Sequence, residues 1–497
     1  RKAINLTREQ EFIINDFANE YEKGIRGTYL IHGVTGSGKT EVYIEIISKV
    51  VKEGKKVIML IPEIALTYQT VSRFYQYFGK RISVMNSKLS QGERYDQFLR
   101  MKNGDIDIII GPRSALFAPF DNLGLIIIDE EHEDSYKSEN PPKYHARNVA
   151  IKRAELTGAS VILGSATPSI ESYKNALDGK YKLYTLSNRV GKGQLPKVWV
   201  EDLSQELKKK NTSIFSERLA KLIRDRLEKK EQIILFINRR GYAGFVSCRS
   251  CGHVKKCPHC DISLTSHNNG KLMCHYCGYQ EYMPKACPVC GSKFIAAFGT
   301  GTQKVESLVR AAFPEARILR MDADTTRKKN AHQKILSSFA REEADILIGT
   351  QMIIKGHDFP KVTLVGILAA DLSLYAGDYR SSEKTFQLLV QASGRAGRGD
   401  LPGEVVIQTY NPDHYSIESA KVGNYVDFYK KEIEFRKLLL YPPIGNILAI
   451  LISSKEEEKV EKASKLIAGA AKEYEKDKKS DSLSIIIGSV PARLSKV

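Results

Sequence analysis

The chain has 497 residues, of which 42% are apolar, so it is long enough for about three domains with sizeable cores. Lys and Arg total 76 against 58 Asp and Glu, and this formal charge of +18 favours a polyanionic partner such as nucleic acid over a merely solvated basic surface or a membrane surface. No apolar run approaches the roughly 18 residues of a membrane span, and the clustering of all eight Cys between Cys248 and Cys290 excludes a scattered secreted disulfide framework and predicts a cytosolic, metal-binding chain.

Short apolar runs alternate with amphipathic stretches of helical length in the first part of the chain. The runs cover residues 29–31, 57–61, 106–110, 125–128 and 161–163. Runs this short, with Gly or charged residues at their edges, predict buried strands, and their alternation with helices predicts a parallel sheet. We therefore expect an α/β lobe over residues 1–185, with an N-terminal lead-in.

The same scheme returns in the second half of the chain. Its apolar runs cover residues 233–237, 318–319, 346–348, 362–368 and 405–407. Residues 105–114 resemble residues 344–352, which suggests two related lobes. The predicted boundaries are a linker over 186–212, a second α/β lobe over 213–245 and 293–420, a Cys-rich insert over 246–292, and a small α+β C-terminal domain over 421–497. Within that last domain we expect a strand over 447–452 and a charged helix over 455–476.

A glycine-rich segment between a predicted strand and a predicted helix matches the phosphate-loop pattern G-x-x-x-x-G-K-[ST]. The candidate nucleotide-binding residues are Gly33, Val34, Thr35, Gly36, Ser37, Gly38, Lys39 and Thr40. Backbone N–H groups of such a loop wrap nucleotide phosphates, and we expect Lys39 to reach the β- and γ-phosphates of ATP and the Thr40 hydroxyl to ligate Mg²⁺. The alternative is a chance glycine-rich turn.

The apolar run 125–128 ends in Asp129, Glu130, Glu131 and His132. A carboxylate at a strand end near a phosphate loop is where an Asp must lie to hold Mg²⁺. We therefore predict Asp129 as the second Mg²⁺ ligand and Glu130 as the group that polarises the attacking water. A solvated strand end is the alternative.

A Gly- and Ala-rich segment near residue 395 carries two Arg on one face of a predicted helix, because Arg395 and Arg398 are three residues apart. A guanidinium presents a planar fork that suits phosphate oxygens. We predict both as arginine fingers that stabilise the transition state, with Gln391 as a third catalytic residue of the segment. A basic surface helix is the alternative.

The eight Cys form four CxxC pairs, which are Cys248/Cys251, Cys257/Cys260, Cys274/Cys277 and Cys287/Cys290. Eight thiolates in this pattern predict two tetrahedral Cys₄ zinc sites. In a nested arrangement the two middle pairs make one site and the outer pairs close the other. Sequential pairing, first with second and third with fourth, remains open from spacing alone.

Taken in order, several segments resemble the motifs of superfamily 2 helicases. They are GSGKT, PEIALT (62–67), DEEH (129–132), GSATPS (164–169), FINRRGY (236–242), GTQMIIKGHDFP (349–360) and QASGRAGRG (391–399). More narrowly, GVTGSGKTEVY, DEEHEDSYK with PKYHARNVA, and FINRRGYAGFVSCRSCGHVKKCPHC resemble the PriA family of bacterial primosomal replication-restart helicases, over nearly the whole chain.

The resemblance implies two RecA-like lobes, nested zinc pairing, and an ATP-dependent 3′–5′ DNA helicase that uses ATP, Mg²⁺ and two Zn²⁺. Such a helicase would act at stalled or collapsed replication forks and promote primosome assembly. Its implied partners are single-stranded and forked DNA, single-stranded DNA-binding protein, primosome loader proteins and the replicative helicase, at the nucleoid in the bacterial cytoplasm and with no membrane.

The resemblance also implies that a loop after the DEEH motif couples DNA binding to hydrolysis. In this chain the loop carries Tyr136, Lys137, Tyr144, His145 and Arg147. Aromatic faces stack on bases and cations meet phosphates, so these residue types suit single-stranded DNA. A plain polar loop is the alternative.

The sequence departs from the family at both ends. Family members carry an N-terminal DNA-binding region and a winged helix, whereas this chain starts close to Leu6 without an initiator Met, so we expect a fragment with an incomplete C-terminal domain. Other functions remain open: a duplex translocase, a helicase acting on RNA, or a zinc-ribbon DNA-binding adaptor with decayed ATPase motifs.

Overall fold

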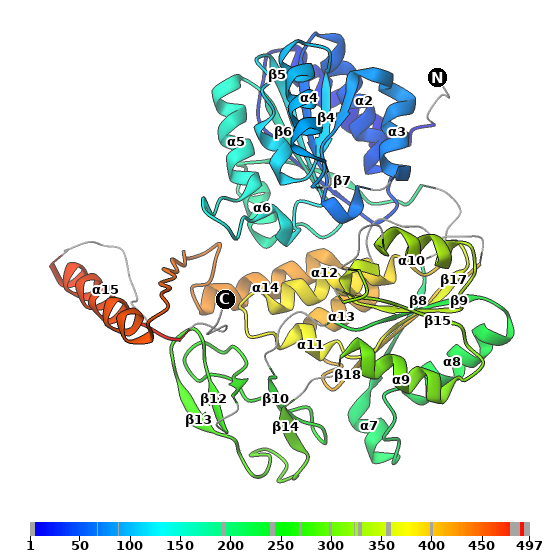
Figure 1. Cartoon of the computed structure of the whole chain (residues 1–497), viewed down its shortest axis with the longest axis vertical. Helices are drawn as coiled ribbons and strands as arrows, with labels where there is room; N and C mark the ends of the chain where they lie inside the picture. The colour runs from blue at the N-terminus through cyan, green and yellow to red at the C-terminus, as the bar shows by residue number, and fades with distance from the viewer. Residues whose placement is uncertain are drawn as a thin grey trace. The chain divides into compact units, whose positions relative to one another are not determined.

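The structure of the chain is a computed structural model, and in it the chain folds into two compact units (Figure 1). It describes residues 5–66, 68–87, 89–190, 195–238, 244–267, 270–297, 301–322, 324–326, 331–353, 359–397, 401–477 and 488–491. The first unit comprises Arg1–Pro196, Met352–Thr363 and Val390–Gly403, and the second comprises Lys197–Gln351, Leu364–Leu389 and Glu404–Val497.

The first unit is built on a seven-stranded parallel sheet with the strand order β3-β4-β2-β5-β6-β1-β7. Its strands are β1 (Thr28–Gly33), β2 (Lys56–Leu60), β3 (Ile82–Val84), β4 (Ile108–Gly111), β5 (Leu123–Asp129), β6 (Ser160–Ser165) and β7 (Lys182–Leu186). The Ile- and Leu-rich central strands are buried on both faces, as a parallel sheet requires. The predicted parallel α/β lobe is confirmed.

Helices pack their apolar stripes on this sheet. They are α1 (Arg8–Glu22), α2 (Lys39–Lys52), α3 (Tyr68–Phe78), α4 (Gln91–Lys102), α5 (Ala146–Thr157) and α6 (Ile170–Leu177), with short 3₁₀ turns η1 (Glu63–Ala65), η2 (Gly79–Arg81), η3 (Arg113–Phe117) and η4 (Asp134–Tyr136). Helix α1 shows why the pattern works, since Ile13, Phe17 and Tyr21 recur on one face and all three are buried. This helix is the predicted lead-in.

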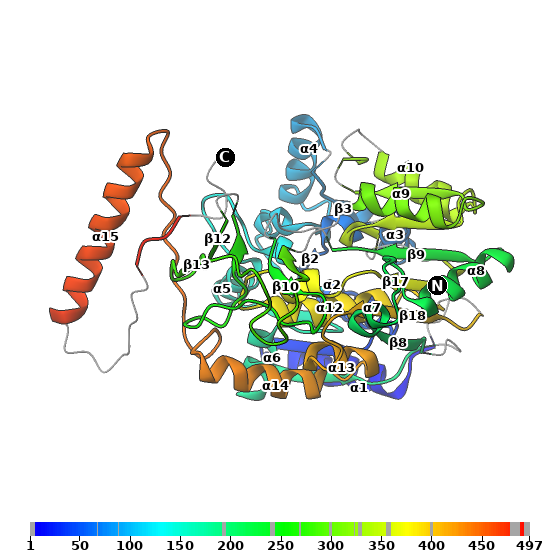
Figure 2. The ribbon, with the colours of Figure 1, turned by 90° about the horizontal axis from the view of Figure 1, so that it is seen from below.

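The second unit is built on a six-stranded sheet with the order β15-β16-β9-β17-β18-β8, and every strand pair described in it is parallel. Its strands are β8 (Lys197–Asp202), β9 (Gln232–Phe236), β15 (Ile318–Met321), β16 (Ile346–Gly349), β17 (Val362–Ile367) and β18 (Glu404–Thr409). Figure 2 shows β9, β17, β18 and β8 side by side. The second predicted parallel lobe is also confirmed.

The second part of the chain contains further helices, some of which follow one another without an intervening strand. They are α7 (Leu203–Lys208), α8 (Glu217–Glu228), α9 (Thr302–Ala312), α10 (Ala331–Ala340), α11 (Asp371–Leu374), α12 (Ser381–Ser393), α13 (Tyr415–Val422), α14 (Tyr425–Leu438) and α15 (Glu457–Asp477), with the 3₁₀ turn η5 (Gln351–Ile353).

The predicted linker over 186–212 contains a strand of the second sheet. Strand β8 pairs with β18 from Lys197 opposite Glu404 to Asp202 opposite Thr409, and Trp199 Nε1 donates a 2.9 Å hydrogen bond to Glu404. Because both ends of this stretch are rich in Gly or Lys, its overall composition is typical of a linker, although a short strand lies between those ends.

The Cys-rich insert consists of two small antiparallel sheets. One pairs β10 (Val246–Cys248) with β14 (Ile295–Ala297), and the other joins β11 (Thr265–Ser266), β12 (Lys271–Met273) and β13 (Gln280–Tyr282). Buried hydrogen bonds attach the insert to the rest of its unit: Ser263 Oγ donates to Tyr375 O at 2.7 Å, and Tyr441 Oη donates to Cys260 O at 2.8 Å.

The segment after residue 420, predicted as a separate domain, is continuous with the second lobe. Helix α13 crosses that boundary, and the fully buried Arg436 of α14 donates to Glu383 of α12 at 2.6 Å and to Glu432 at 2.8 Å. Residues 447–452, predicted as a strand, have no strand structure, and their Leu448 is 87% exposed. Their apolar side chains are typical of a strand, but no described segment pairs with them.

None of the helices in the described ranges combines the length and the apolar character that a bilayer span requires.

Candidate functional site

The glycine-rich loop between β1 and α2 has the geometry of a preformed phosphate cradle. Gly36 and Gly38 have φ angles of +80° and +77°, in the left-handed region that favours glycine. A Cβ on Gly33 would lie 2.6 Å from Ser37 Oγ, so a larger residue does not fit there. Lys39 Nζ donates a 2.9 Å hydrogen bond to Gly33 O, which places the ammonium group over the loop at the start of α2.

Gln10 of α1, which the sequence analysis did not single out, fixes this loop from the adjacent helix. Its side chain is buried, and its Nε2 donates to Ser37 O at 3.0 Å and to Gly38 O at 3.3 Å. A Cβ on Gly38 would collide with this amide. The same Gln10 completes a capping box with Thr7, and the spacing T-x-x-Q before an apolar run is the signal that would have found it.

Asp129, the predicted Mg²⁺ ligand, lies at the carboxyl end of β5 and is held by two buried tyrosines. Tyr43 Oη of α2 donates to Asp129 Oδ1 at 3.1 Å, and Tyr136 Oη donates to the backbone O of Asp129 at 2.7 Å. Burial and the neighbouring Glu130 carboxylate raise the pKa of Asp129 to about 6. A carboxylate so desolvated gains from a nearby cation, as a metal ligand does.

Two features link the Asp129 strand end to the phosphate loop. Tyr43 lies on the same helix as Lys39, so α2 supplies both the loop cation and the donor to Asp129. Asp129 is also in register with Gly164 of β6, where a Cβ would collide with the Tyr43 hydroxyl. The glycine of the GSATPS segment is therefore required for this tyrosine to reach the carboxylate.

Glu130, the predicted water-polarising residue, has an unusual backbone. Its φ angle is +49°, although it carries a side chain. Non-glycine residues in this region cost on the order of 1–3 kcal/mol and cluster at functional sites. Its side chain is 33% exposed and its Oε2 lies 3.6 Å from His132 Nδ1. The Glu130 carboxylate is therefore partly accessible directly after the buried strand β5.

Glu131, the next residue, is part of a buried polar network. It accepts hydrogen bonds from Ser169 N at 2.6 Å, from Ser172 Oγ at 2.8 Å and from Arg147 Nη1 at 3.2 Å. Its side chain is fully buried, while that of Arg147 is 11% exposed. The network joins the DEEH motif to the GSATPS motif and to the start of α5.

The loop after the DEEH motif therefore differs from the interpretation as a row of DNA contacts. Tyr136 is buried and Arg147 is largely buried, and their polar groups are hydrogen-bonded to Asp129 O and to the Glu131 carboxylate, respectively, instead of facing a base or a phosphate. Lys137 Nζ donates to Lys143 O at 2.6 Å, and Tyr144 packs edge-on against Phe117 with ring centroids 5.4 Å apart. Residue type alone does not distinguish aromatic and basic side chains that face solvent from those that pack inward.

The first unit also includes residues 390–403, and this segment contacts the DEEH motif. Gln391 Nε2 lies 2.8 Å from His132 Nε2, and His132 Nδ1 lies 2.7 Å from Ser165 Oγ, both within hydrogen-bond distance. Burial lowers the pKa of Arg395 to about 10, and the charge of Glu130 opposes that shift. Gln391 and Arg395 thus lie beside the predicted carboxylates.

Several predicted residues lie outside the described part of the chain. They are Thr67 of the PEIALT segment, residues 239–242 of FINRRGY, residues 354–358 of GTQMIIKGHDFP, and Arg398 and Gly399 of the arginine-finger segment. The roles predicted for Arg398 and for Thr40 as a Mg²⁺ ligand stay predictions.

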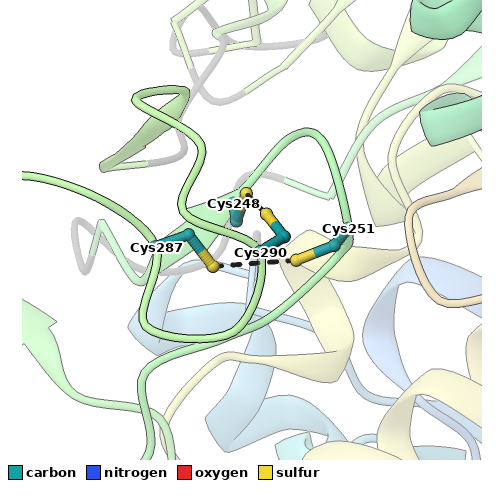
Figure 3. A group of neighbouring side chains, drawn as sticks. All are labelled: Cys248, Cys251, Cys287 and Cys290. Atoms are coloured by element: carbon teal, nitrogen blue, oxygen red, sulfur yellow. Dashed lines mark hydrogen bonds between the residues drawn. The ribbon is translucent and has the colours of Figure 1, made fainter.

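The eight Cys form two groups of four, and the grouping is nested. The outer pairs bring together Cys248, Cys251, Cys287 and Cys290, and the middle pairs bring together Cys257, Cys260, Cys274 and Cys277. Within each group the ligand atoms lie within 4.8 Å of one another, and Figure 3 shows the four outer sulfurs converging. Sγ–Sγ distances of 3.4–3.7 Å are far longer than a disulfide bond, and each group has the donor set of a tetrahedral zinc site.

Comparison with protein-family models gives three matches along the chain. Residues 3–170 match the model described as type III restriction enzyme, res subunit, and residues 292–400 match the helicase conserved C-terminal domain. Residues 257–281, which include the middle Cys group, match the Cys-rich region domain of PriA DNA helicase.

Similar structures and similar curated sequences agree with these matches. A structure of RecG bound to a three-way DNA junction superposes with a TM-score of 0.51 at 15% identity, covering 94% of this chain and 50% of that one, which shows a shared fold alone.

Two curated relatives from different bacteria carry the same name. Replication restart protein PriA of Bacillus subtilis (strain 168) is 50% identical over 94% of this chain, and this chain spans 58% of its length. Replication restart protein PriA of Rickettsia felis is 40% identical over 90% of this chain and 70% of its own length. With the two parallel-sheet lobes and the paired Cys₄ groups, these matches establish that the chain belongs to the PriA family of replication restart proteins.

Proposed function

We propose that this chain is the ATP-driven motor of a DNA helicase that moves 3′ to 5′ on single-stranded DNA and serves replication restart at stalled or collapsed forks. The observation that carries the proposal is the phosphate cradle at the start of α2, with Asp129 bound to Tyr43 of the same helix. A charge of +18 supports a nucleic-acid partner, and the names of the curated relatives support replication restart.

Each residue of the site has a role in phosphoryl transfer to water. Lys39 binds the β- and γ-phosphates, while Thr40 and Asp129 hold Mg²⁺, which neutralises charge on the transferred group when bound. Glu130 accepts a proton from the attacking water. The charge of the transition state is stabilised by Arg395 and Arg398, and Gln391 orients His132 at the strand end.

The two Cys₄ groups are proposed to hold two structural Zn²⁺ ions. Eight Cys sulfurs gathered in two sets of four satisfy two tetrahedral ions, and no carboxylate or imidazole is needed to complete either set. The insert is hydrogen-bonded to the second lobe, and its proposed role is to contact DNA or partner proteins. The proposed partners are forked DNA, single-stranded DNA-binding protein, primosome loaders and the replicative helicase.

Steady-state ATP hydrolysis with and without single-stranded DNA tests the motor. We expect stimulation by DNA in the wild type and loss of hydrolysis in Lys39→Ala, with two zinc ions per chain retained in both. Wild-type turnover in Lys39→Ala would overturn the assignment. Hydrolysis that is absent from a folded, zinc-loaded wild type would instead favour an adaptor with decayed motifs.

Strand displacement separates the remaining alternatives. On forked duplexes with a single 3′ or 5′ tail, a 3′–5′ helicase releases the strand only where it can load and move in that direction. Stimulation of ATP hydrolysis without strand release would indicate a duplex translocase, and release from RNA forks in preference to DNA forks would indicate an RNA helicase.

A further inference from the structure

The chain that follows β7 lies against the phosphate loop. Val34 N donates to Leu186 O at 3.1 Å, and Val190 N donates to Gly36 O at 2.9 Å, so residues 186–190 run beside the loop. This segment was predicted to be the start of a linker. Its backbone hydrogen bonds instead make it part of the wall of the nucleotide site.

Helix α1 holds the same segment from its other side. Glu9 accepts hydrogen bonds from Ser187 N at 3.0 Å and from Asn188 Nδ2 at 3.1 Å. The residue between these contacts and the loop contact of Val190 is Arg189. Hydrogen bonds of the neighbouring residues Asn188 and Val190 therefore fix the backbone of Arg189, and with it the position of the Arg189 Cβ.

The Arg189 side chain crosses the loop at Gly36. A Cβ built on Gly36 would meet Arg189 Cγ at 3.9 Å and Cδ at 4.0 Å, so the aliphatic stem is in ordinary contact distance of that position. The guanidinium Nε is buried and has no hydrogen-bond partner among the residues that the structure describes. Burial lowers the pKa of Arg189. Arg189 as a whole is half-buried, and a nearby anion would give its buried Nε–H group an acceptor, because a buried donor without an acceptor is costly.

We propose that Arg189 is a nucleotide-binding residue, a second cation that meets the phosphates at the rim of the loop opposite Lys39. The proposal rests on the proposed function, because the anion is the nucleotide that the loop binds. Lys39 is bonded to Gly33 at the beginning of the loop, whereas Arg189 crosses its middle at Gly36, so the two cations approach the phosphates from different positions. The planar fork of an Arg suits phosphate oxygens.

Equilibrium binding of a fluorescent ADP analogue to the full chain, without added Mg²⁺, tests the proposal. We expect Arg189→Ala to weaken binding about tenfold or more, because a charge-assisted hydrogen bond to an anion contributes that much. Arg189→Lys, which keeps the charge, should recover part of the affinity. Lys180→Ala removes an exposed cation from the same unit and should bind as the wild type does.

Inorganic pyrophosphate as a competitor shows which part of the nucleotide Arg189 meets. A phosphate contact predicts that Arg189→Ala weakens competition by pyrophosphate in the same ratio as it weakens ADP binding. Wild-type ADP affinity in Arg189→Ala overturns the proposal, and so does weakened ADP binding with unchanged pyrophosphate competition.

Lys39→Ala separates this outcome from failure of the proposed function. If the wild type binds ADP and Lys39→Ala does not, the phosphate loop is a nucleotide site, and an unaffected Arg189→Ala then rejects the Arg189 assignment alone. If Lys39→Ala binds as the wild type does, both proposals are wrong.

Discussion

Replacing Glu131 with Gln removes one charge from the buried network and leaves its shape. The carboxylate accepts from Ser169 N at 2.6 Å, Ser172 Oγ at 2.8 Å and Arg147 Nη1 at 3.2 Å, with no exposed surface. An amide Nε2 in place of one oxygen faces donors and cannot accept from them. The largely buried Arg147 guanidinium then loses its ion-pair partner Glu131, and breaking a buried pair costs about 3–5 kcal/mol.

Urea unfolding at pH 7 measures this loss, and hydrogen exchange locates it. We expect Glu131→Gln to lower the free energy of unfolding by about 3 kcal/mol or more, and to increase exchange in β5 and β6 more than in β9 and β16. The matched control is Glu155→Gln on α5, whose ion pair with Lys152 is 57% and 69% exposed and should cost about 0.5 kcal/mol or less. A cost for Glu131→Gln as small as that of the control would refute the reasoning.

The pH dependence of this difference follows from the direction of the pKa shift. Burial alone would raise the pKa of Glu131, but the charge of Arg147 and the hydrogen bonds from Ser169 and Ser172 lower it below the ordinary value of 4.5. A carboxyl whose pKa is lower in the folded state stabilises the fold above the unfolded value, and loses that contribution as pH falls through the folded value. The wild type should therefore lose its advantage over Glu131→Gln only below about pH 4.5. An advantage that fades between pH 8 and pH 6 would contradict the assignment.

Three further outcomes are expected. Tyr43→Phe should raise the Mg²⁺ concentration that half-saturates ATP hydrolysis several-fold, while ADP binding without Mg²⁺ stays unchanged, because the lost hydroxyl orients Asp129 and not the phosphates; an unchanged Mg²⁺ titration would contradict this. Gly164→Ala should lower the melting temperature, since its methyl group collides with that hydroxyl, and Tyr43→Phe in the same chain should restore part of the loss. Removal of zinc by a chelator should increase hydrogen exchange across 246–297 and at Tyr441, which donates to Cys260 O, but not in β5; protection retained by the stripped insert would argue against structural zinc.

The parts of the fold that were predictable from sequence are those with a local physical signature. The run 125–128 is apolar at every position, and such a run predicts a strand of a parallel sheet that is buried on both faces. In the structure it forms the centre of β5. The phosphate loop could also be predicted from sequence, because its glycine pattern is local. Gly36 and Gly38 adopt left-handed backbone conformations that other residues avoid. The nested Cys grouping followed less from spacing than from family resemblance, because spacing left two arrangements open.

The parts that were not predictable depend on contacts between distant segments. The run Val198-Trp199-Val200 pairs with a strand some two hundred residues later, and its own sequence does not indicate this partner. The Gly and Lys residues that flank the run are typical of a linker, which is what the sequence predicts there. The strand predicted at 447–452 failed for the converse reason: an apolar alternation is a strand only when another strand accepts its hydrogen bonds.

The loop after the DEEH motif shows how the two kinds of information combine. Composition suggested bases and phosphates as partners for Tyr136 and Arg147, but both side chains are bonded to residues 129 and 131 of the motif itself. The loop is thereby hydrogen-bonded at both ends to the end of β5 and the residues just after it, where the predicted Mg²⁺ ligand Asp129 lies. A displacement of its exposed middle by DNA would be transmitted to Asp129 through the hydrogen bond that the Tyr136 hydroxyl donates to the Asp129 carbonyl oxygen, without the side chain of Tyr136 or Arg147 touching DNA. Loss of DNA stimulation in Tyr136→Phe therefore could not by itself identify Tyr136 as a DNA contact, and crosslinking of bound DNA should find Tyr144 or Lys137 instead.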